Sequence, residues 1–233
     1  WITELYRQEQ TKFKPKDLNV NYLVVENSPN NKFKDEICAI SDNITWLDNP
    51  PTQNWAGGSS DHCRGLTHGR DFIKDEWVFI CDNDSVVTSE SFFSEFFKKA
   101  EEGFDCMAVS HHPDHDTAHL SGGFFKTELV KKVDLYPFYN GNKFHDTGSG
   151  LTFKSEKHYI FRNTWNDNSL VDIINDPYKS WGETCGIDRC LDSNNNIMHI
   201  HLGRGVLKYR GGYTKPNKRT YSDWIEFIEK ELL

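Results

Sequence analysis

The sequence lacks the features of membrane proteins and of nucleic-acid-binding proteins. No apolar run approaches the roughly 18 residues needed to span a bilayer, and the first residues have the pattern of neither a signal peptide nor an anchor. Basic residues are outnumbered, with 27 Lys and Arg against 35 Asp and Glu and a formal net charge of −8. Because phosphate backbones are bound by basic surfaces, this charge argues against a nucleic-acid partner. We expect a soluble chain with no transmembrane segment.

The sequence also lacks the cysteine pattern of small secreted, disulfide-stabilised proteins. Its six cysteines are scattered along the chain: Cys38, Cys63, Cys81, Cys106, Cys185 and Cys190. Cys81 and Cys106 stand in apolar, strand-like segments, as buried free thiols do. Cys185 and Cys190 are near enough for a local disulfide, although their spacing does not favour one. Residues 83–85 form a glycosylation sequon inside the acidic motif described next, and decoration there would block that motif. We therefore expect a cytoplasmic compartment.

The most informative segment is a short apolar strand followed by acidic residues. Residues 77–81 are all apolar, which is typical of a buried strand in a parallel sheet. Asp82, Asn83 and Asp84 follow where the strand should end. Residues two apart in an extended segment point the same way, so Asp82 and Asp84 can converge on one cation; the plainer alternative is a simple turn. The carboxyl ends of parallel strands form a ligand crevice, so a hard-metal site for a phosphate-bearing substrate is expected there.

Strands and helices alternate through the first half of the sequence. The pattern predicts strands at 22–25, 44–47, 77–81, 105–110 and 197–202, and helices at 1–13, from about 59, 88–103, 127–133 and 144–158. This alternation predicts an α/β fold, a single Rossmann-like domain over residues 1–233 with a mainly parallel central sheet flanked by helices. We expect residues 1–110 to bind a nucleotide and residues 111–233 to shape an acceptor pocket. Residues 163–196 are polar and poorly patterned.

The order of these landmarks resembles the GT-A fold glycosyltransferases, and within them the family 2-like inverting enzymes. The resemblance extends over roughly residues 20–205 and depends on the order of several weak motifs. In that family an early strand ends in an acidic residue that contacts the nucleotide base, the place that Glu26 or Asn27 takes here. A glycine-rich helix start follows in the family, and residues 57–62 are similar to it. The D-x-D motif comes next. The resemblance implies six residues for binding the nucleotide sugar: Glu26, Asn27, His62, Asp82, Asn83 and Asp84.

Later landmarks resemble the acceptor side of the same family. Residues 121–125 are similar to its Gly-Gly-aromatic segment, and Asp146 stands where the family places its catalytic base. His145 departs from the family, which usually has Glu before that base. Many GT-A enzymes supply a late metal-binding histidine, for which His201 is the candidate and His199, two residues before it, the alternative. The resemblance thus implies three metal ligands: Asp82, Asp84 and His201.

The function implied by the resemblance is transfer of a sugar from a nucleotide-diphosphate sugar to the hydroxyl of a glycan or another acceptor. An inverting mechanism needs one base, the role implied for Asp146, whose plainer alternative is a helix cap. Mn²⁺ or Mg²⁺ would stabilise the departing diphosphate, and a histidine ligand favours Mn²⁺. A GT-A fold normally begins with a strand, whereas this chain opens in a predicted helix. We therefore expect the first strand to be missing or supplied from elsewhere.

Other functions fit parts of the pattern. Residues 80–86 resemble the nucleophile motif of haloacid-dehalogenase-like phosphatases, in which Asp82 would attack phosphate and Asp84 would serve as acid and base. That motif, however, normally stands on the first strand of its fold. A nucleotidyltransferase would need a basic, glycine-rich entry loop that this sequence lacks, and a sugar-binding module would keep the pocket without turnover. The histidines within 111–119 raise the possibility of zinc, but Pro113 interrupts any helix that would align them.

Overall fold

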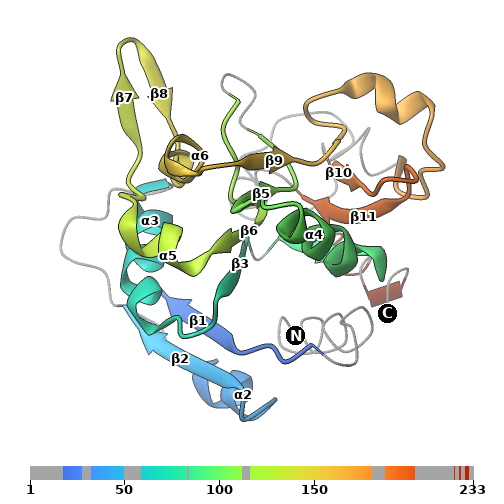
Figure 1. Cartoon of the computed structure of the whole chain (residues 1–233). Helices are drawn as coiled ribbons and strands as arrows, with labels where there is room; N and C mark the ends of the chain where they lie inside the picture. Colours follow the sequence, from blue (N-terminus) through green and yellow to red (C-terminus); the bar gives the residue numbers. More distant parts are fainter. Residues whose placement is uncertain are drawn as a thin grey trace.

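Figure 1 shows the chain as a computed structural model. The structure describes residues 18–27, 33–49, 59–82, 84–111, 116–179 and 187–202, and the positions 223, 226, 229 and 230. Three predictions concern residues outside this description: the helix at 1–13, the first strand, and the role of Asn83. No helix in the described part of the chain is long and apolar enough to cross a membrane.

The first described elements alternate between strand and helix. They are β1 (Tyr22–Glu26), α2 (Lys34–Cys38), β2 (Ile44–Asp48), α3 (Ser59–Gly69), the 3-10 helix η1 (Arg70–Phe72) and β3 (Trp77–Cys81). The strands predicted at 22–25, 44–47 and 77–81 are therefore confirmed. β1 and β2 pair in parallel, with Tyr22 opposite Ile44, and α3 packs on β1. This part of the chain has the predicted βαβ organisation.

The remaining elements build two further sheets and a hairpin. They are β4 (Ser85–Val87), α4 (Ser91–Glu101), β5 (Cys106–Ala108), β6 (Gly122–Lys126), α5 (Thr127–Lys132), β7 (Phe138–Asn140), β8 (Lys143–His145), α6 (Ser149–Lys154), β9 (His158–Ile160), η2 (Asn168–Asp172), β10 (Asp188–Leu191) and β11 (Ile197–His201). One sheet has the order β3-β6-β5-β9 and the other the order β10-β11-β4. β3 belongs to the first of these sheets and β4 to the second, so Asp82 and Asp84 lie where the chain passes from one sheet to the other.

The fold is mixed α/β, as predicted, but the expectation of a mainly parallel sheet was wrong. Among the described strand pairs, β1–β2 and β5–β9 are parallel, whereas β3–β6, β5–β6, β4–β11, β10–β11 and β7–β8 are antiparallel. A parallel connection needs a long crossover, usually a helix. The described residues between β5 and β6 contain no helix, and β6 returns between its two neighbours in the antiparallel direction.

One glycine of β6 leaves room for a buried aromatic ring. Gly123 is paired with Ile80 of β3 on one side and with Ala108 of β5 on the other. A Cβ at Gly123 would lie 2.4 Å from the ring of Phe125 and 3.1 Å from the carbonyl oxygen of Met107. Only glycine therefore leaves room for the ring of Phe125 beside this backbone, and a larger residue would also crowd the carbonyl oxygen of Met107 on β5.

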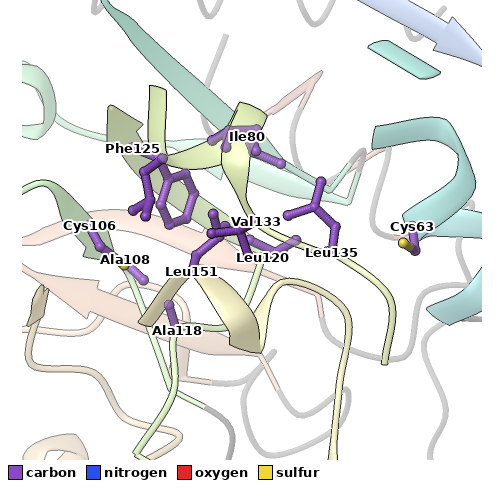
Figure 2. Packing of buried hydrophobic residues seen from close by; sticks show 12 residues of the cluster. Cys63, Ile80, Cys106, Ala108, Ala118, Leu120, Phe125, Val133, Leu135 and Leu151 are labelled. Carbon is purple, nitrogen blue, oxygen red and sulfur yellow. The ribbon is translucent and has the colours of Figure 1, made fainter. Parts of the chain in front are cut away.

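One apolar cluster lies where this sheet meets α5 and α6. Phe125 and Ile80 lie near one another, with Leu120, Val133 and Leu151 packed around them (Figure 2). Phe125 and Leu151 have no solvent exposure. The cluster fixes the positions of the segments that precede and follow Asp146, because Leu135 and Leu151 stand on either side of it in the chain.

The predicted helix at 88–103 and its phenylalanine stripe are confirmed by α4. Phe92, Phe93 and Phe96 are buried and meet Phe79 of β3 edge to face. Phe97 is half-buried and contacts Phe124. Such edge-to-face pairs add to the stabilisation from burial, so α4 serves as a packing element of the core.

The helix predicted at 144–158 was wrong at both of its ends. β7 and β8 form an antiparallel hairpin that ends at His145, and α6 begins only at Ser149 and stops at Lys154. Gly141, with φ +61°, supplies the left-handed turn between the two strands. Gly148, with φ +80°, then precedes the helix. Residues 144–148 are therefore the end of a strand and a turn, where the start of a helix was predicted.

The five described cysteines, Cys38, Cys63, Cys81, Cys106 and Cys190, are free thiols, and Cys185 lies outside the described residues. Burial raises the pKa of Cys106 to about 12. Cys81, expected to be buried, is exposed. Cys81 is the last residue of β3, directly before Asp82, and it lies outside the core.

Truncation of the α4 stripe is expected to cost stability in proportion to burial. Phe96→Ala removes a ring that is 1% exposed and is expected to lower the free energy of unfolding by about 3–5 kcal/mol. Phe97→Ala, on the same helix but half-buried, is the matched control and should cost less. Chemical denaturation monitored by circular dichroism gives both values; equal losses would contradict this account of the core.

Candidate metal and active site

The candidate site begins with the two aspartates between β3 and β4. Asp82 follows Cys81, whose neighbour across the sheet is Gly122 of β6. Asp84 stands just before β4, and its carbonyl oxygen accepts a hydrogen bond of 2.9 Å from the backbone N–H of Leu202. The Asp84 residue is 8% exposed, whereas the Asp82 side chain is 28% exposed. The carboxylate of Asp84 is thus buried, whereas that of Asp82 is partly exposed to solvent.

His201 completes a group of three side chains. β11 pairs with β4 so that His201 stands opposite Ser85. Its Nε2 lies 3.3 Å from Oδ1 of Asp84 and 3.8 Å from Oδ2 of Asp82. One ligand atom from each residue lies within 4.8 Å of the other two. Among the described residues this is the group of His, Cys, Asp and Glu side chains that could hold a metal ion.

A fourth residue, Asp188, orients the imidazole. It is paired with His201 across β10 and β11, and its Oδ2 lies 3.2 Å from Nδ1 of His201. A carboxylate on the second nitrogen of a metal-binding histidine fixes the ring and its tautomer, leaving Nε2 for the ion. The sequence analysis missed Asp188 because it lies in the poorly patterned stretch. The residues around it carry no clear signal, because Arg189 and Asp192 interrupt the apolar pattern before the strand of His201.

The carboxylates strongly affect the protonation of His201. Burial disfavours its charge, but hydrogen bonds with Asp188 and Asp84 outweigh burial and raise its pKa to about 10. Burial raises the pKa of Asp82, and the neighbouring carboxylates of Asp84 and Asp146 act in the same direction. The site without a metal is therefore a cluster of acidic groups neutralised in part by a protonated histidine.

His199, the alternative metal ligand, has a different environment. Its ring stacks on Phe92, with centroids 5.6 Å apart, and the residue is 2% exposed. Burial lowers the pKa of His199 to about 3. Its Nε2 has no hydrogen-bond partner among the described residues, and a Cβ at Gly122 would lie 3.1 Å from it. The structure thus brings His201, and not His199, into the group with the two aspartates.

The predicted nucleotide-binding residues fall into two sets. Nε2 of His62, on α3, lies 3.7 Å from Oδ1 of Asp82 and therefore borders the site. Asn27 donates from its side chain to the carbonyl oxygen of Asp61 and accepts from Asn49, at 2.9 and 2.7 Å. Its amide therefore fastens β1 to α3. Glu26 is half-buried at the end of β1.

Asp146 lies in the turn between β8 and α6. Its carboxylate accepts a 2.7 Å hydrogen bond from the N–H of Thr147, the next residue. Gly148 occupies the N-cap position of α6, and no side chain caps this helix. The hydroxyl of Thr147 donates to the carbonyl oxygen of Ser59 at 2.6 Å, which ties the turn to the start of α3. Asp146 is near enough to Asp82 to raise the pKa of that carboxyl.

The histidine-rich segment divides between two locations. His119 lies beside the site: its ring centroid is 6.0 Å from that of His201, and it meets Trp165 edge to face at 5.0 Å. His111 is fixed through its backbone, which exchanges two hydrogen bonds with the side chain of Asn166. Residues 112–115 lie outside the described part. Among the described histidines of this segment, none joins a group that could bind a metal.

The donor set fits a divalent cation. Two carboxylates and one imidazole suit Mn²⁺, whereas carboxylates with water alone suit Mg²⁺. The grouping also collects negative charge that a cation would neutralise. Asp82, Asp84 and His201 are therefore the residues able to hold the ion, and Asp188 the residue that orients one of them.

Comparisons with known proteins give little further information. No family model and no curated protein matches the sequence. One similar solved structure is the mannosyltransferase PcManGT from Pyrobaculum calidifontis in complex with GDP-Man and Mn²⁺, with 13% identity, a TM-score of 0.41 and coverage of 56% of this chain and 43% of that one. Another is the bifunctional IspDF from Campylobacter jejuni, with 15% identity, a TM-score of 0.41 and coverage of 68% and 41%. The chain thus spans less than half the length of either.

Metal binding is expected to release a proton from His201. With its pKa near 10, this histidine is protonated at neutral pH and must lose the proton to act as a ligand. Affinity for Mn²⁺ should therefore rise as pH increases and level off above that pKa. Calorimetry near pH 7.5, repeated in buffers of different ionisation enthalpy, should show release of about one proton. Asp188→Asn should release less, because one carboxylate that holds the proton is gone; binding without proton release would exclude His201 as a ligand.

Proposed function

We propose that this protein is a metal-dependent glycosyltransferase that moves a sugar from a nucleotide-diphosphate sugar to an acceptor hydroxyl with inversion. The observation that supports this most is the meeting of Asp82, Asp84 and His201 within 4.8 Å, with Asp146 in electrostatic reach of Asp82. A cation site beside a separate carboxylate is what the reaction requires. The leaving group needs charge neutralisation and the acceptor needs a base.

In this proposal the residues of the site have distinct roles. Asp84 and His201, which are both buried, and Asp82, which is more exposed, would hold the ion. The bound ion would neutralise the charge that grows on the departing diphosphate. Asp188 keeps Nδ1 of His201 engaged so that Nε2 faces the aspartates. His62 lies on the other side of Asp82 and lines the donor site.

Asp146 is the proposed general base. It is half-buried, and the hydrogen bond from Thr147 holds one of its oxygens. That leaves the second oxygen to accept a proton from the acceptor hydroxyl. A base on a turn tied to α3 by Thr147 would keep its place relative to the donor site. We propose one domain over residues 1–233, with 1–110 binding the donor and 111–233 the acceptor.

The reaction class is tested by turnover. Purified protein incubated with Mn²⁺ and a panel of UDP-, GDP- and dTDP-sugars should slowly release the nucleoside diphosphate, and chelation should stop the release. Release of phosphate from p-nitrophenyl phosphate instead would favour the phosphatase alternative, with Asp82 as the nucleophile. Binding of nucleotide sugars without hydrolysis or transfer would favour a sugar-binding module.

Asp84→Asn is expected to abolish metal-dependent nucleotide binding. Loss of a direct ligand should weaken Mn²⁺ binding by more than about 100-fold, since loss of an outer-sphere partner alone costs 10–100-fold. Thermal shift with UDP or GDP, with and without Mn²⁺, measures this, because a ligand of the folded state raises the melting temperature. Asp71→Asn, at an exposed position on η1, is the control and should respond like the wild type. An unchanged metal-dependent shift in Asp84→Asn would contradict the ligand assignment.

Asp146→Asn is expected to separate binding from catalysis. The asparagine oxygen can still accept from the N–H of Thr147, so the turn should remain intact. Donor binding should persist while kcat for transfer falls by about 10²–10⁴-fold, the contribution of a general base. Rates with saturating donor and acceptor, compared with nucleotide thermal shifts, distinguish these effects. Normal transfer by the variant would remove Asp146 from this role.

A further inference from the structure

A cavity of about 570 Å³ lies between α5, α6 and the β7–β8 hairpin. It belongs to the part of the chain, residues 111–233, that we propose binds the acceptor. Its size is within the range of small-ligand sites, about 300–1,000 Å³. Apolar side chains from three elements form most of its wall, and charged or amide groups stand around them. The lining residues are Leu129, Lys132, Val133, Asp134, Phe138, Asn140, Gly150, Phe153 and Lys154.

The cavity presents an aromatic ring to solvent. Phe153 on α6 is 50% exposed, although it contacts Phe138 with ring centroids 6.0 Å apart. Gly150 lets α6 approach closely here, because a Cβ at that position would lie 2.7 Å from the carbonyl oxygen of Asp134. An exposed aromatic ring in a concave site is more typical of ligand recognition than of a folded core.

The two faces of the hairpin differ. Strand pairing places Phe138 opposite His145, and Tyr139 opposite Phe144. Because side chains alternate along a strand, Phe138 and Asn140 face the cavity, whereas Tyr139 and Phe144 point to the other side. Tyr139 is 73% exposed. The hairpin therefore supplies a cavity-facing aromatic residue and, one position away, an aromatic residue outside the cavity.

The aromatic wall continues to the proposed base. The ring of His145 stacks on Phe138 and meets Phe153 edge to face, with both centroid distances 5.0 Å. Asp146 is the next residue and lies near Asp82 instead. One peptide unit thus joins the wall of the cavity to the candidate active site.

We propose that this cavity binds sugar units of a glycan and serves as an acceptor subsite. A pyranose ring has an apolar C–H face, which stacks on an aromatic ring such as Phe153, and hydroxyl edges, which pair with Asn140, Lys154 and Asp134. The role as an acceptor site rests on the proposed glycosyl transfer, whereas saccharide binding itself does not.

Binding is tested without donor or metal. Cellohexaose, maltohexaose, chitohexaose and hexagalacturonate are titrated into the full chain in EDTA and followed by saturation-transfer NMR. At least one probe should bind, and Phe153→Ala should weaken it about tenfold, the loss expected for one aromatic stacking contact. Tyr139→Ala, on the opposite face of the hairpin, should bind like the wild type. Asn140→Ala, at an exposed position, provides a second cavity variant should Phe153→Ala fold poorly.

Three outcomes would overturn the assignment: no probe binds; the cavity variants bind as the wild type does; or Tyr139→Ala loses binding instead. Binding to phosphatidylcholine vesicles in place of the saccharides would also overturn it. With an active preparation, Phe153→Ala should raise the KM for the saccharide acceptor, whereas Tyr139→Ala should leave that KM unchanged. Saccharide binding through Phe153 in a protein that turns over no nucleotide sugar would refute the glycosyltransferase proposal but retain the cavity as a sugar site.

Discussion

The antiparallel pairing of β4 with β11 is the contact on which the candidate site depends. Val86 pairs with Ile200, and both are buried in one apolar cluster. The next pair is Ser85 with His201, which places the imidazole against Asp84. A shift of one residue would turn every side chain of β11 to the opposite face of the sheet. Packing of ordinary apolar residues therefore determines the position of the histidine that contacts both aspartates of the acidic motif.

This arrangement concentrates charge that the protein alone neutralises incompletely. Asp82, Asp84 and Asp188 all lie within 4 Å of His201, which carries the local positive charge. Like charges so close disfavour each other's ionisation, and a buried charge needs a partner. Burial is the main cause of the raised pKa of Asp82, with Asp84 and Asp146 acting in the same direction, whereas the carboxylates of Asp188 and Asp84 raise the pKa of His201 against the effect of burial. A divalent cation would replace the proton on His201 and relieve the repulsion.

The sequence predicted those parts of the fold and site that depend on local pattern. The strand before Asp82, the β1–β2 unit and the stripe on α4 follow from apolar spacing within one segment. The direction of β6 and the place of Asp188 depend on pairing between distant segments. Gly123 is required by the ring of Phe125, which lies over its backbone, and by the nearby carbonyl oxygen of Met107 on β5, contacts that the apolar pattern does not show. The same limit explains why residues 144–148 resembled a helix start: Asp146, Thr147 and Gly148 are typical of one in sequence, whereas the left-handed conformation of Gly148 is visible only in the structure.

Residues 145–148 contact both the rings that border the cavity and the start of α3. His145 is buried between the rings that border the cavity, and Thr147 is bonded to Ser59 at the start of α3. Between them stands Asp146, which therefore has little freedom to move with respect to either side. Gly148 cannot be replaced easily, because a Cβ there would lie 2.5 Å from Leu120 and its φ is positive. The conformation of the turn at Asp146 thus depends on the aromatic contacts of His145, the hydrogen bond of Thr147 and the glycine at position 148 together.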